Sequence, residues 1–455
     1  MHDVIIVGGG ISGMTAAFLL QKSGRDVLVL EEKSEPGGHI RTLSEKGVRM
    51  ETGPHSFMGS SEFTWKLVED LEMGESVMPA SPSSKNRYIF RNESLTPLPM
   101  GLSSFIRTPL LSWPAKLRLM MEPFIPNGAQ EDDTAWDFFC RRFGREAANF
   151  IMSPFVSGVY AGDVKMLGAR AAFPKFWNFE KDSGSMIWGA VKYMRNKKRR
   201  LKREGIEPKK GLFSFNGGLG NITQILAERL RSGILLEKSV TGVHKVENGY
   251  KVESGGESWK ARAVVLATPP STTASLLEGS LNGMTDDLKK IPMSPVALIH
   301  WRAREDNHTF PDGFGFLMPR LFEYRVLGTL FPSRLFPNRV SDGWQLFASF
   351  YGGMTDPGAV DLSDDALIEL LLDEHRRIFH TTLDGVEILR ILRYSAAIPQ
   401  LLPDHPERIM QFREILKKKM PGIDLAGNYL TGVGIEHAIE SGYAAYDRIH
   451  EFLAN

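Results

Sequence analysis

The stretch DVIIVGGGISGMTAAFLLQKSGRDVLVLEEK, residues 3–33, decides the fold. Its first apolar run, residues 4–7, is rich in β-branched side chains and predicts a buried parallel strand. Residues 11–23 follow with a helical pattern, and Gly24 is placed to end that helix. A second apolar run, residues 27–30, predicts the next strand. The stretch therefore predicts a βαβ unit, the building block of a doubly wound α/β sheet.

Three glycines at GxGxxG spacing join the first strand to the helix. Gly8 suits a tight turn, Gly10 lets a ligand approach the backbone, and Gly13 lets the helix pack closely on the strand. The helix N-terminus would face an anion. Glu31 follows the second strand, eighteen residues after Gly13, where a carboxylate can accept hydrogen bonds from a ribose. The order of these features predicts a dinucleotide site, against the alternative of a βαβ unit that binds nothing.

The composition is that of a soluble globular protein with two or three domains. The chain has 455 residues, of which 42% are hydrophobic and 24% charged, and its formal net charge is +1. A near-neutral chain without aromatic residues among its basic ones gives no support for nucleic-acid binding. The one cysteine, Cys140, excludes an intrachain disulfide and a cysteine-based metal cluster, and we expect no metal site.

No targeting or membrane-spanning segment is expected. The first predicted strand begins at residue 3 or 4, which leaves no room for a signal or transit peptide. The chain has no run of about eighteen apolar residues that would cross a bilayer as a helix. We therefore expect a cytoplasmic protein.

Two further turns come soon after the predicted ribose acid. EPGGHIRT, residues 35–42, offers Gly38 for another close backbone approach and Arg41 as a cation for a diphosphate. The alternative is a surface turn with a solvated arginine. ETGPHSF, residues 51–57, turns the chain again near the same site.

The middle of the chain changes character. Residues 91–204 are apolar, amphipathic and punctuated by prolines, and they predict a helical insert. Its Met, Phe and Trp side chains would form either a membrane-facing surface or an ordinary helical core. The basic run at residues 195–210 is typical of a solvated linker or of a contact with anionic lipid headgroups. Residues 76–90 and 286–384 predict a sheet domain for a substrate, and the first sheet would combine residues 1–75, 205–285 and 385–455.

Two later segments return the chain to the first sheet. AVVLATPP, residues 263–270, predicts a central parallel strand. DLAGNYLTGVGIEHAIESGYAAYDRIHEFL, residues 424–453, predicts a strand, a glycine-rich turn and a helix. The glycine turns at the two chain ends, about 420 residues apart, predict one large cofactor held from both sides.

Together these features resemble the two-domain FAD oxidoreductases, a superfamily of amine oxidases, carotene desaturases and porphyrinogen oxidases. Within it, four segments are similar to the oxygen-dependent protoporphyrinogen oxidases and their coproporphyrinogen-oxidising relatives: SPFVSGVYAGD (153–163), LGARAAFPKFWNFEKDSGS (167–185), GTLFPSRLFPNR (328–339) and GVGIEHAIESGYAA (432–445). The resemblance runs nearly end to end. It implies a Rossmann-like α/β domain for FAD, an α+β substrate domain and a helical, membrane-associated insert.

The resemblance also implies a reaction. Protoporphyrinogen IX would lose six electrons to give protoporphyrin IX in heme biosynthesis, as hydride passes three times from a bridging carbon to flavin N5. Molecular oxygen would be the final acceptor and would yield hydrogen peroxide. No side-chain base and no metal is implied, and FAD would be bound without a covalent link.

Site residues follow from the same resemblance. It places a substrate arginine at Arg87, a backbone-carbonyl contact at Gly158, and an apolar clamp at Leu317, Leu330 and Phe350. Taken singly, Leu330 and Phe350 are also typical of a core, and Arg87 of a surface. The expected cofactor contacts are Gly8, Gly10, Ile11, Ser12, Gly13, Glu31, Glu32, Gly38, Arg41, Gly53, Pro54, His55, Val240, Gly432, Val433, Gly434 and Ile435.

The chain departs from the family at one site position. Where the family commonly reads GGRIRT, this chain has His39 in place of the first arginine, and Arg41 keeps the second. FAD binding is therefore still expected, while the role of the first arginine is in doubt.

Several alternatives stay open. A flavin amine oxidase would commonly have a cysteine link to FAD and an aromatic cage, whereas Gly434 stands at the cage position here. A carotene-type desaturase would not share the VYAGD segment, and a binding protein of the GDP-dissociation-inhibitor type would use the fold without FAD. Within the family, coproporphyrinogen III carries four propionates instead of two and would favour further cations, for which Arg170, Lys192 and Arg320 are candidates.

The sequence around Arg87, NRYIFRN, favours protoporphyrinogen. The expected partners are the porphyrinogen and molecular oxygen, together with a peripheral contact at the inner face of the cell membrane. Family members often form homodimers, so a homodimer is an alternative to a monomer.

Overall fold

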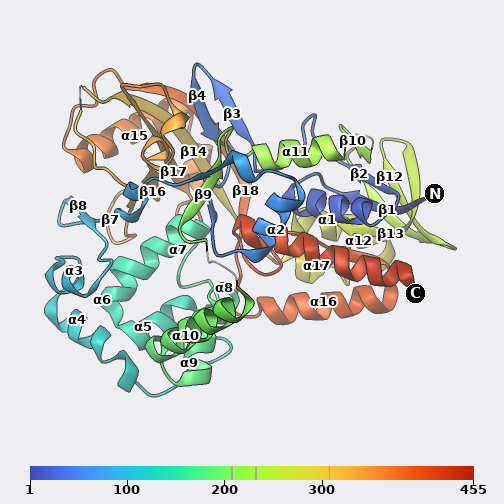
Figure 1. Cartoon of the computed structure of the whole chain (residues 1–455), viewed down its shortest axis with the longest axis horizontal. Coiled ribbons are helices and arrows are strands. Elements are labelled where there is room, and N and C mark those ends of the chain that lie inside the picture. Colours follow the sequence, from blue (N-terminus) through green and yellow to red (C-terminus); the bar gives the residue numbers. More distant parts are fainter. Residues whose placement is uncertain (206–208, 231–232, 307) are drawn as a thin grey trace.

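Two large sheets and a helical region make up the protein (Figure 1). The computed structural model describes residues 1–205, 209–230, 233–306 and 308–455. The first sheet has the strand order β10-β2-β1-β13-β12-β11, and β19 pairs with the end of β13. All its pairings are parallel except those of the β11–β12–β13 meander. Its strands are β1 (His2–Val7), β2 (Val27–Leu30), β10 (Ile234–Leu235), β11 (Gly242–Val246), β12 (Gly249–Ser254), β13 (Glu257–Leu266) and β19 (Ile423–Leu425).

Side-chain alternation along β1 shows that the first sheet is covered on both faces. Val4 and Ile6 belong to one hydrophobic core, and Ile5 and Val7 belong to the core on the opposite face. A strand buried on both sides is apolar throughout, as the sequence indicated. The predicted βαβ unit and the α/β class are confirmed. One face packs on α1 (Ile11–Lys22), α2 (Glu62–Asp70), α11 (Asn221–Arg229) and α17 (Ile435–Ala454), and the other on α12 (Pro270–Leu281), α13 (Asp286–Lys289) and α16 (His405–Lys419).

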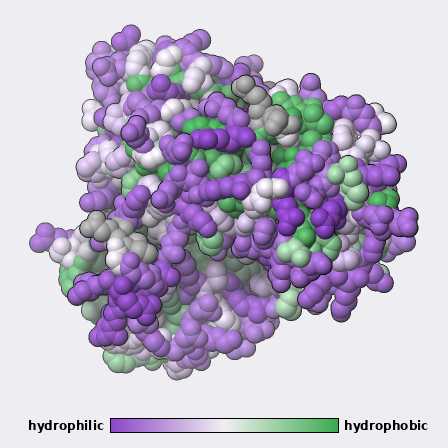
Figure 2. All heavy atoms as spheres, turned by 45° about the vertical axis from the view of Figure 1, so that its right-hand side comes forward, coloured by the Kyte–Doolittle hydropathy of each residue, from purple (hydrophilic) through white to green (hydrophobic). Residues whose placement is uncertain are grey.

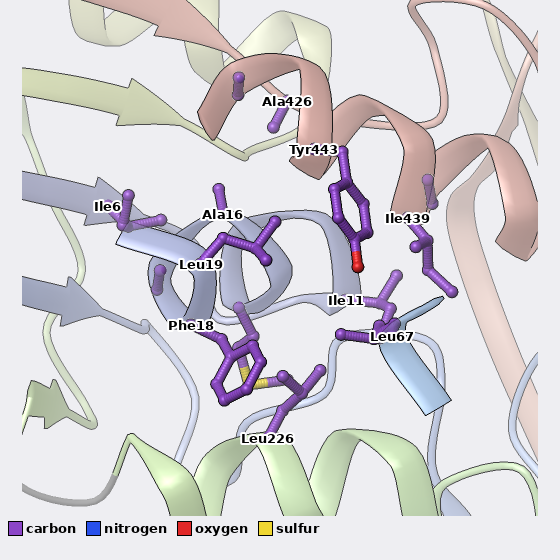
Figure 3. Packing of buried hydrophobic residues seen from close by; sticks show 14 of the residues in the cluster. Ile6, Ile11, Ala16, Phe18, Leu19, Leu67, Leu226, Ala426, Ile439 and Tyr443 are labelled. Atoms are coloured by element: carbon purple, nitrogen blue, oxygen red, sulfur yellow. The ribbon is translucent and has the colours of Figure 1, made fainter. Parts of the chain in front are cut away.

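Helix α1 is buried along most of its length, from Ile11 to Leu20. Figure 3 shows Phe18 of α1 beside Leu226 of α11, within the same core as Tyr443 of α17. A Cβ atom on Gly13 would lie 2.2 Å from the carbonyl oxygen of Gly8, and one on Gly442 would lie 2.7 Å from that of Ser12. Glycine at these positions therefore lets α1 approach both β1 and α17.

The second sheet has the strand order β18-β14-β17-β16-β15-β7-β8. Its strands are antiparallel except for the β15–β7 pair, and residues 286–384, predicted to form a sheet, supply β14 to β17. Helix α15 (Asp364–Phe379) covers one face with Leu367, Leu371 and Ile378. The strands are β7 (Arg87–Arg91), β8 (Ser94–Pro97), β14 (Met293–Arg304), β15 (Gly315–Leu317), β16 (Gly328–Leu330), β17 (Trp344–Gly352) and β18 (Glu387–Pro399).

Two segments belong to the second sheet, although the predicted domain limits placed them elsewhere. Residues 387–399 were expected with the first sheet, but β18 hydrogen-bonds along β14 in the second sheet. Residues 94–97 were expected in the helical insert, but β8 closes a hairpin with β7 at the edge of the second sheet. Pairing between distant segments decides the first case, and local sequence does not encode it. The second case is a local hairpin, which turns at Asn92 and Glu93, both with positive φ. Beyond these two segments, the division into domains stays a prediction.

Residues 102–204 are mainly helical. The stretch DTAWDFFCRRFGREAANFIMSPF, residues 133–155, has a helical pattern throughout, but its helix is broken at Gly144, which has a φ of +88°, and a π-helical turn follows at Ala148–Met152. The basic run, expected as a linker, continues α10 as far as Glu204, and residues 206–208 of that run lie outside the described residues. The helices are α3 (Leu102–Arg107), α4 (Trp113–Met120), α5 (Ala135–Phe143), α6 (Arg145–Ala147), α7 (Ser153–Tyr160), α8 (Ala169–Ala172), α9 (Pro174–Ser183) and α10 (Met186–Glu204).

Small elements fill the junction between these parts. Strand β9 pairs with both β5 and β6, and β3 pairs with β4. Among the described residues, no helix combines the length and the apolar character that crossing a membrane requires. The remaining elements are β3 (Thr42–Glu45), β4 (Val48–Glu51), β5 (Phe57–Met58), β6 (Val77–Pro79), β9 (Leu212–Phe215) and α14 (Pro332–Leu335).

Candidate cofactor and substrate site

A cavity of about 300 Å³ lies at the carboxyl ends of the parallel strands of the first sheet. Gly8 follows β1, Glu31 follows β2, Ala267 follows β13 and Gly427 follows β19, and all four residues line the cavity. In open α/β sheets this edge is where ligands bind. The sheet topology therefore brings together segments from both ends and the middle of the chain.

Two helix N-termini point their first turns at the cavity. Gly10 and Gly434 are the N-cap residues of α1 and α17, and neither helix has a side-chain hydrogen bond at its cap. Ile11, Ser12 and Ile435 of the first turns line the cavity. The first N–H groups of a helix have no partner within the helix and carry partial positive charge, so they bind anions such as a diphosphate.

The buried carboxylate of Glu31 closes one end of the cavity. It accepts hydrogen bonds from the backbone N–H of Gly9, at 2.6 Å, and of Lys33, at 3.0 Å. A carboxylate has about four acceptor sites, so these bonds fix its orientation and leave capacity for two ribose hydroxyls. This geometry agrees with the ribose role predicted for Glu31.

The other end of the cavity is walled by the second sheet. Met293 of β14 and Ala396 and Ala397 of β18 line it, together with Pro54 and His39. The His39 ring packs edge-on against Tyr394 of β18, with ring centroids 4.9 Å apart. Burial, and then the charges of Lys33 and Arg41, lower the pKa of His39, so its imidazole is neutral at pH 7.

Twelve of the predicted cofactor residues line this cavity: Gly8, Gly10, Ile11, Ser12, Glu31, Glu32, Gly38, Pro54, Val240, Val433, Gly434 and Ile435. The other five lie outside its wall. Gly13, Gly53 and Gly432 pack against Gly8, His39 and His437, and His55 lies behind Pro54. Arg41, expected at a diphosphate, instead forms an ion pair with Glu35 at 2.8 Å.

Sequence reasoning missed other lining residues, including Lys33, Lys238, Ala267, Met293, Ala397 and Gly427. Ala267 and Gly427 follow parallel strands, so the rule that ligands bind at carboxyl strand ends could have found them. Met293 and Ala397 come from the second sheet, and no local pattern marks them.

The four predicted substrate side chains lie on one face of the second sheet. Phe316, Thr329 and Ser349 are register partners on the face toward α15. The next residues along these strands, Leu317, Leu330 and Phe350, therefore point to the opposite face. In the parallel β15–β7 pair, Arg87 is the register partner of Gly315 and shares that face.

This opposite face is accessible. Phe316, Thr329 and Ser349 are buried, whereas Leu317, Leu330 and Phe350 are only partly buried and Arg87 is exposed. Figure 2 shows that the mostly hydrophilic surface is hollowed near the middle of this view, with less polar atoms inside the hollow. The Arg87 guanidinium lies 4.9 Å from the Phe314 ring centroid, and partial burial lowers its pKa. A guanidinium nevertheless stays charged at pH 7.

Helix α7 lies against the same face and presents Gly158 to it. A Cβ atom on Gly158 would lie 2.2 Å from Cδ2 of Leu317, so a larger residue here would displace the Leu317 side chain. The helix ends at Tyr160, and the N–H of Gly162 bonds to Val156 instead of Gly158. The Gly158 carbonyl is therefore one of the last-turn groups that have no partner within the helix.

A doubly wound sheet with this cavity, joined to a second sheet with an accessible apolar face, defines a dinucleotide-dependent oxidoreductase. The sequence pattern of the family described as "Flavin containing amine oxidoreductase" matches residues 11–450. Protoporphyrinogen oxidase 1 of spinach chloroplasts (Spinacia oleracea) is 30% identical over 477 residues, which cover 99% of this chain and 84% of that protein.

Coproporphyrinogen III oxidase of Bacillus subtilis (strain 168) is 27% identical, over 97% of this chain and 96% of its own. Among solved structures, a putative protoporphyrinogen oxidase from Exiguobacterium sp. 255-15 has a TM-score of 0.83 at 23% identity, covering 100% of this chain and 99% of its own. The chain belongs to the flavin-containing amine oxidoreductases and, within them, to the family of protoporphyrinogen and coproporphyrinogen III oxidases.

FAD is the cofactor of this enzyme, and the cavity suits it. The two uncapped helix N-termini would hold the diphosphate, and Glu31 would hold the ribose. Cys140 lies in α5 and is not part of the cavity wall. In the ranges that the structure describes, no group of three or more His, Cys, Asp or Glu side chains is arranged to hold a metal ion.

Proposed function

We propose that the enzyme oxidises protoporphyrinogen IX to protoporphyrin IX in heme biosynthesis, with non-covalently bound FAD and with oxygen as the acceptor that yields hydrogen peroxide. The observation that carries this proposal is the accessible face of the second sheet. It combines Leu317, Leu330 and Phe350 with the guanidinium of Arg87. A porphyrinogen presents the complementary chemistry, a wide apolar ring with propionate arms.

Each residue has a distinct task in binding. The three apolar side chains would bury the ring, at about 25 cal/mol for each Å² of apolar surface removed from water. Arg87 would pair with a propionate through charge-assisted hydrogen bonds. The free carbonyl of Gly158 would accept a pyrrole N–H, and together these contacts would fix the bridging carbons relative to the cofactor.

When bound, FAD supplies the hydride acceptor, and the chain supplies the positioning. The apolar wall would keep water from the reacting carbon, while Arg87 holds the propionate at the exposed end. The second sheet also contributes Met293 of β14 and Ala397 of β18 to the cofactor cavity, so the substrate face and the cavity share one sheet.

The charges around this face favour two propionates over four. Arg170 already pairs with Glu131 and Glu407, and Arg320 donates to the carbonyls of Arg325 and Val326. Lys192 lies on the outer helix α10, beside a surface groove. Among the described residues, no carboxylate lies within 4.0 Å of the Arg87 side chain. Of the candidate arginines Arg87, Arg170 and Arg320, only Arg87 has neither an ion pair nor a carbonyl partner among the described residues, which supports protoporphyrinogen over coproporphyrinogen III.

The test compares the two porphyrinogens on the purified holoenzyme. Porphyrin fluorescence would follow product formation, and oxygen uptake with peroxide detection would identify the acceptor. We expect higher kcat/KM with protoporphyrinogen IX and one peroxide for each two-electron step. Faster turnover of coproporphyrinogen III would contradict the choice of substrate and leave the flavin assignment intact.

We also propose a peripheral contact with the inner face of the cell membrane through the helical insert. Trp113 and Phe124 are 62% and 80% exposed, and Met100, Leu102, Leu117 and Met121 nearby are also exposed. The basic helix α10 packs near residues 122–124 and would add attraction to anionic lipid. Such a surface is typical of interfacial binding.

Vesicle sedimentation tests this contact. We expect binding to vesicles with anionic phospholipid, weakened by salt and by the double change Trp113→Ser with Phe124→Ser. Met410→Ser, which removes a side chain that is 61% exposed on α16, serves as the matched control and should bind as before. Equal binding by the double variant would contradict the proposal. The homodimer stays a prediction.

A further inference from the structure

Three strands of the second sheet hold the chain where helix α7 ends. Tyr160 is the last residue of α7, and its carbonyl accepts hydrogen bonds from Gln400 Nε2 at 2.9 Å and from Ser294 Oγ at 3.3 Å. The carbonyl of Ala161 accepts a third bond, from the N–H of Met354 at 2.8 Å. Gln400 follows β18, Ser294 lies in β14 and Met354 follows β17, so the end of α7 is fixed to all three strands.

Ala161 shows how closely this segment is constrained. Its φ of +45° and ψ of +36° are left-handed, which is costly for a residue that carries a Cβ atom. Such a conformation persists where the surrounding contacts determine it, and it is frequent at functional sites. Ala161 packs in one small core with Phe350, of the substrate face, and with Ala397, which lines the cofactor cavity. The strained residue therefore lies where the two binding regions meet.

The fully buried side chain of Gln400 links the same two regions. Its Nε2 also donates to the carbonyl of Ile398 at 3.0 Å, and its backbone N–H donates to the carbonyl of Pro292 at 2.8 Å. These two carbonyls belong to the neighbours of Ala397 and Met293, which both line the cofactor cavity. One carboxamide thus connects the end of α7 to the strands at the cavity.

Gly162 leaves the space that this carboxamide occupies. A Cβ atom on Gly162 would lie 2.6 Å from Oε1 of Gln400. That oxygen is buried and has no hydrogen-bond partner among the described residues. A buried acceptor without a partner costs free energy, and an apolar side chain of the same size would avoid that cost. The carboxamide therefore serves its two donor bonds better than it serves general stability.

We propose that Gln400 is a positioning residue for the reaction, which holds the end of α7, and with it the Gly158 carbonyl, in a fixed place relative to the cofactor cavity. This inference rests on the proposed contact between Gly158 and a pyrrole N–H, and it holds for either porphyrinogen. Because hydride transfer depends steeply on the placement of the reacting atoms, a small shift of α7 slows this step more than it weakens binding.

The test measures how fast a porphyrinogen reduces the flavin of the holoenzyme without oxygen, by stopped-flow absorbance. Gln400→Leu keeps the size of the side chain and removes both donor bonds. We expect the rate at saturating porphyrinogen to fall about ten- to a hundredfold, while KM and the content of bound FAD stay near the wild-type values. Gln345→Leu is the matched control, because Gln345 is an equally buried glutamine of β17 that bonds to Arg334 at 3.0 Å, and it should leave the rate unchanged.

Gln400→Glu provides a rescue that a purely structural role would not give. An ionised carboxylate only accepts hydrogen bonds and would repel the carbonyls of Tyr160 and Ile398, whereas a protonated carboxyl donates to one of them. Burial raises the pKa of a carboxyl group, so the rate relative to the wild type should rise as the pH falls from about 8 to about 6. A ratio that stays constant over this range would contradict the donor role of the carboxamide.

An unchanged rate of flavin reduction in a folded Gln400→Leu enzyme would overturn the proposal. If that variant does not fold, Gly162→Ala disturbs the same contact from the other side and should slow flavin reduction in the same way.

Hydrogen exchange gives a measurement that needs no substrate. The amides of residues 158–166 should exchange faster in Gln400→Leu than in the wild type or in Gln345→Leu, and unchanged exchange would also overturn the proposal. If neither porphyrinogen reduces the wild-type flavin, the proposed function fails, and the exchange rates still decide whether Gln400 holds α7.

Discussion

Among single residues, Arg87 is the one that we propose for the electrostatic part of substrate recognition. It is the first residue of β7, and its side chain lies on the accessible face of the second sheet, beside the Phe314 ring. Among the described residues, no carboxylate lies within 4.0 Å of it. A cation without a protein partner gains most from an incoming anion, since it gives up no existing ion pair.

Replacing Arg87 with Ala should therefore raise KM for the porphyrinogen by about ten- to a hundredfold, which corresponds to about 1.5–3 kcal/mol for a charge-assisted hydrogen bond. The content of bound FAD should not change. Steady-state kinetics and the flavin absorbance of the purified variant measure the two quantities. Lys85→Ala, at an exposed lysine two residues before β7, is the control. Loss of FAD in the Arg87 variant would show that the residue serves the cofactor instead.

Two glycines of the turn between β1 and α1 belong to one motif but differ in their surroundings. A Cβ atom on Gly10 would meet no atom within 4 Å, whereas one on Gly13 would lie 2.2 Å from the backbone oxygen of Gly8. Gly13 is thus required by the contact of helix and strand, and we expect Gly10 to serve the ligand.

Gly10→Ala should fold with a melting temperature near that of the wild type and bind FAD weakly, because the added methyl group enters the cavity. Gly13→Ala should lose about 1–3 kcal/mol of unfolding free energy or more, because backbone atoms cannot yield. Thermal unfolding of the apoproteins and FAD titration separate the two effects. Equal stability of both apoproteins would contradict this division.

Among the secondary-structure elements, the helices of the insert are held together by a buried ion cluster. Arg142 of α5 is fully buried and bonds to Glu122, to Glu180 of α9 at 3.4 Å, and to the carbonyl of Gly184 at 3.1 Å. Glu122 also accepts from Ser185 Oγ at 2.6 Å and from the N–H of Met186 at 2.8 Å. The cluster therefore ties α5, α9 and the start of α10 together.

Arg142→Met should destabilise the protein by about 3–5 kcal/mol, because it leaves buried carboxylates without their charge partner. Arg203→Ala, an exposed arginine of α10, should change the unfolding free energy by less than about 0.5 kcal/mol. Chemical denaturation of the two variants beside the wild type measures this difference. A change of similar size in both would contradict the structural role of the cluster.

Features that depend on a short stretch of sequence could be predicted, whereas contacts between segments far apart in the sequence could not. The βαβ unit, Glu31 and both glycine turns were predicted because strand, turn and helix signals are local. The pairing of β18 with β14 and the ion pair that draws Arg41 to Glu35 depend on backbone positions and competing partners in space. The substrate face was found only through resemblance, since strand alternation does not say which face meets a ligand.

Buried histidines make the stability of the whole molecule depend on pH. Burial lowers the pKa of His300 and of His375 to about 4, from 6.5. Both are neutral in the fold, so the unfolded chain binds more protons between these values. Their contribution to the unfolding free energy is fully present above about pH 6.5 and is lost as pH falls toward 4.

The unfolding free energy should fall over this range, with a slope of up to about 2.7 kcal/mol per pH unit from the two histidines. Denaturant titrations at several pH values measure it. His375→Gln should reduce the slope by about 1.4 kcal/mol per pH unit, the share of one proton. The same slope in that variant would contradict the low pKa of His375.

The packing of α1 against α17 has a consequence for how the enzyme is made. Helices α1 and α17 meet so closely that a Cβ atom on Gly442 would touch the backbone of Ser12, and both helices begin at the cofactor cavity. During synthesis the N-terminal half of the flavin site leaves the ribosome some 400 residues before its counterpart. A nascent chain can therefore hold FAD from both sides only after α17 has been synthesised, and a chain that stops before α17 should not retain the cofactor.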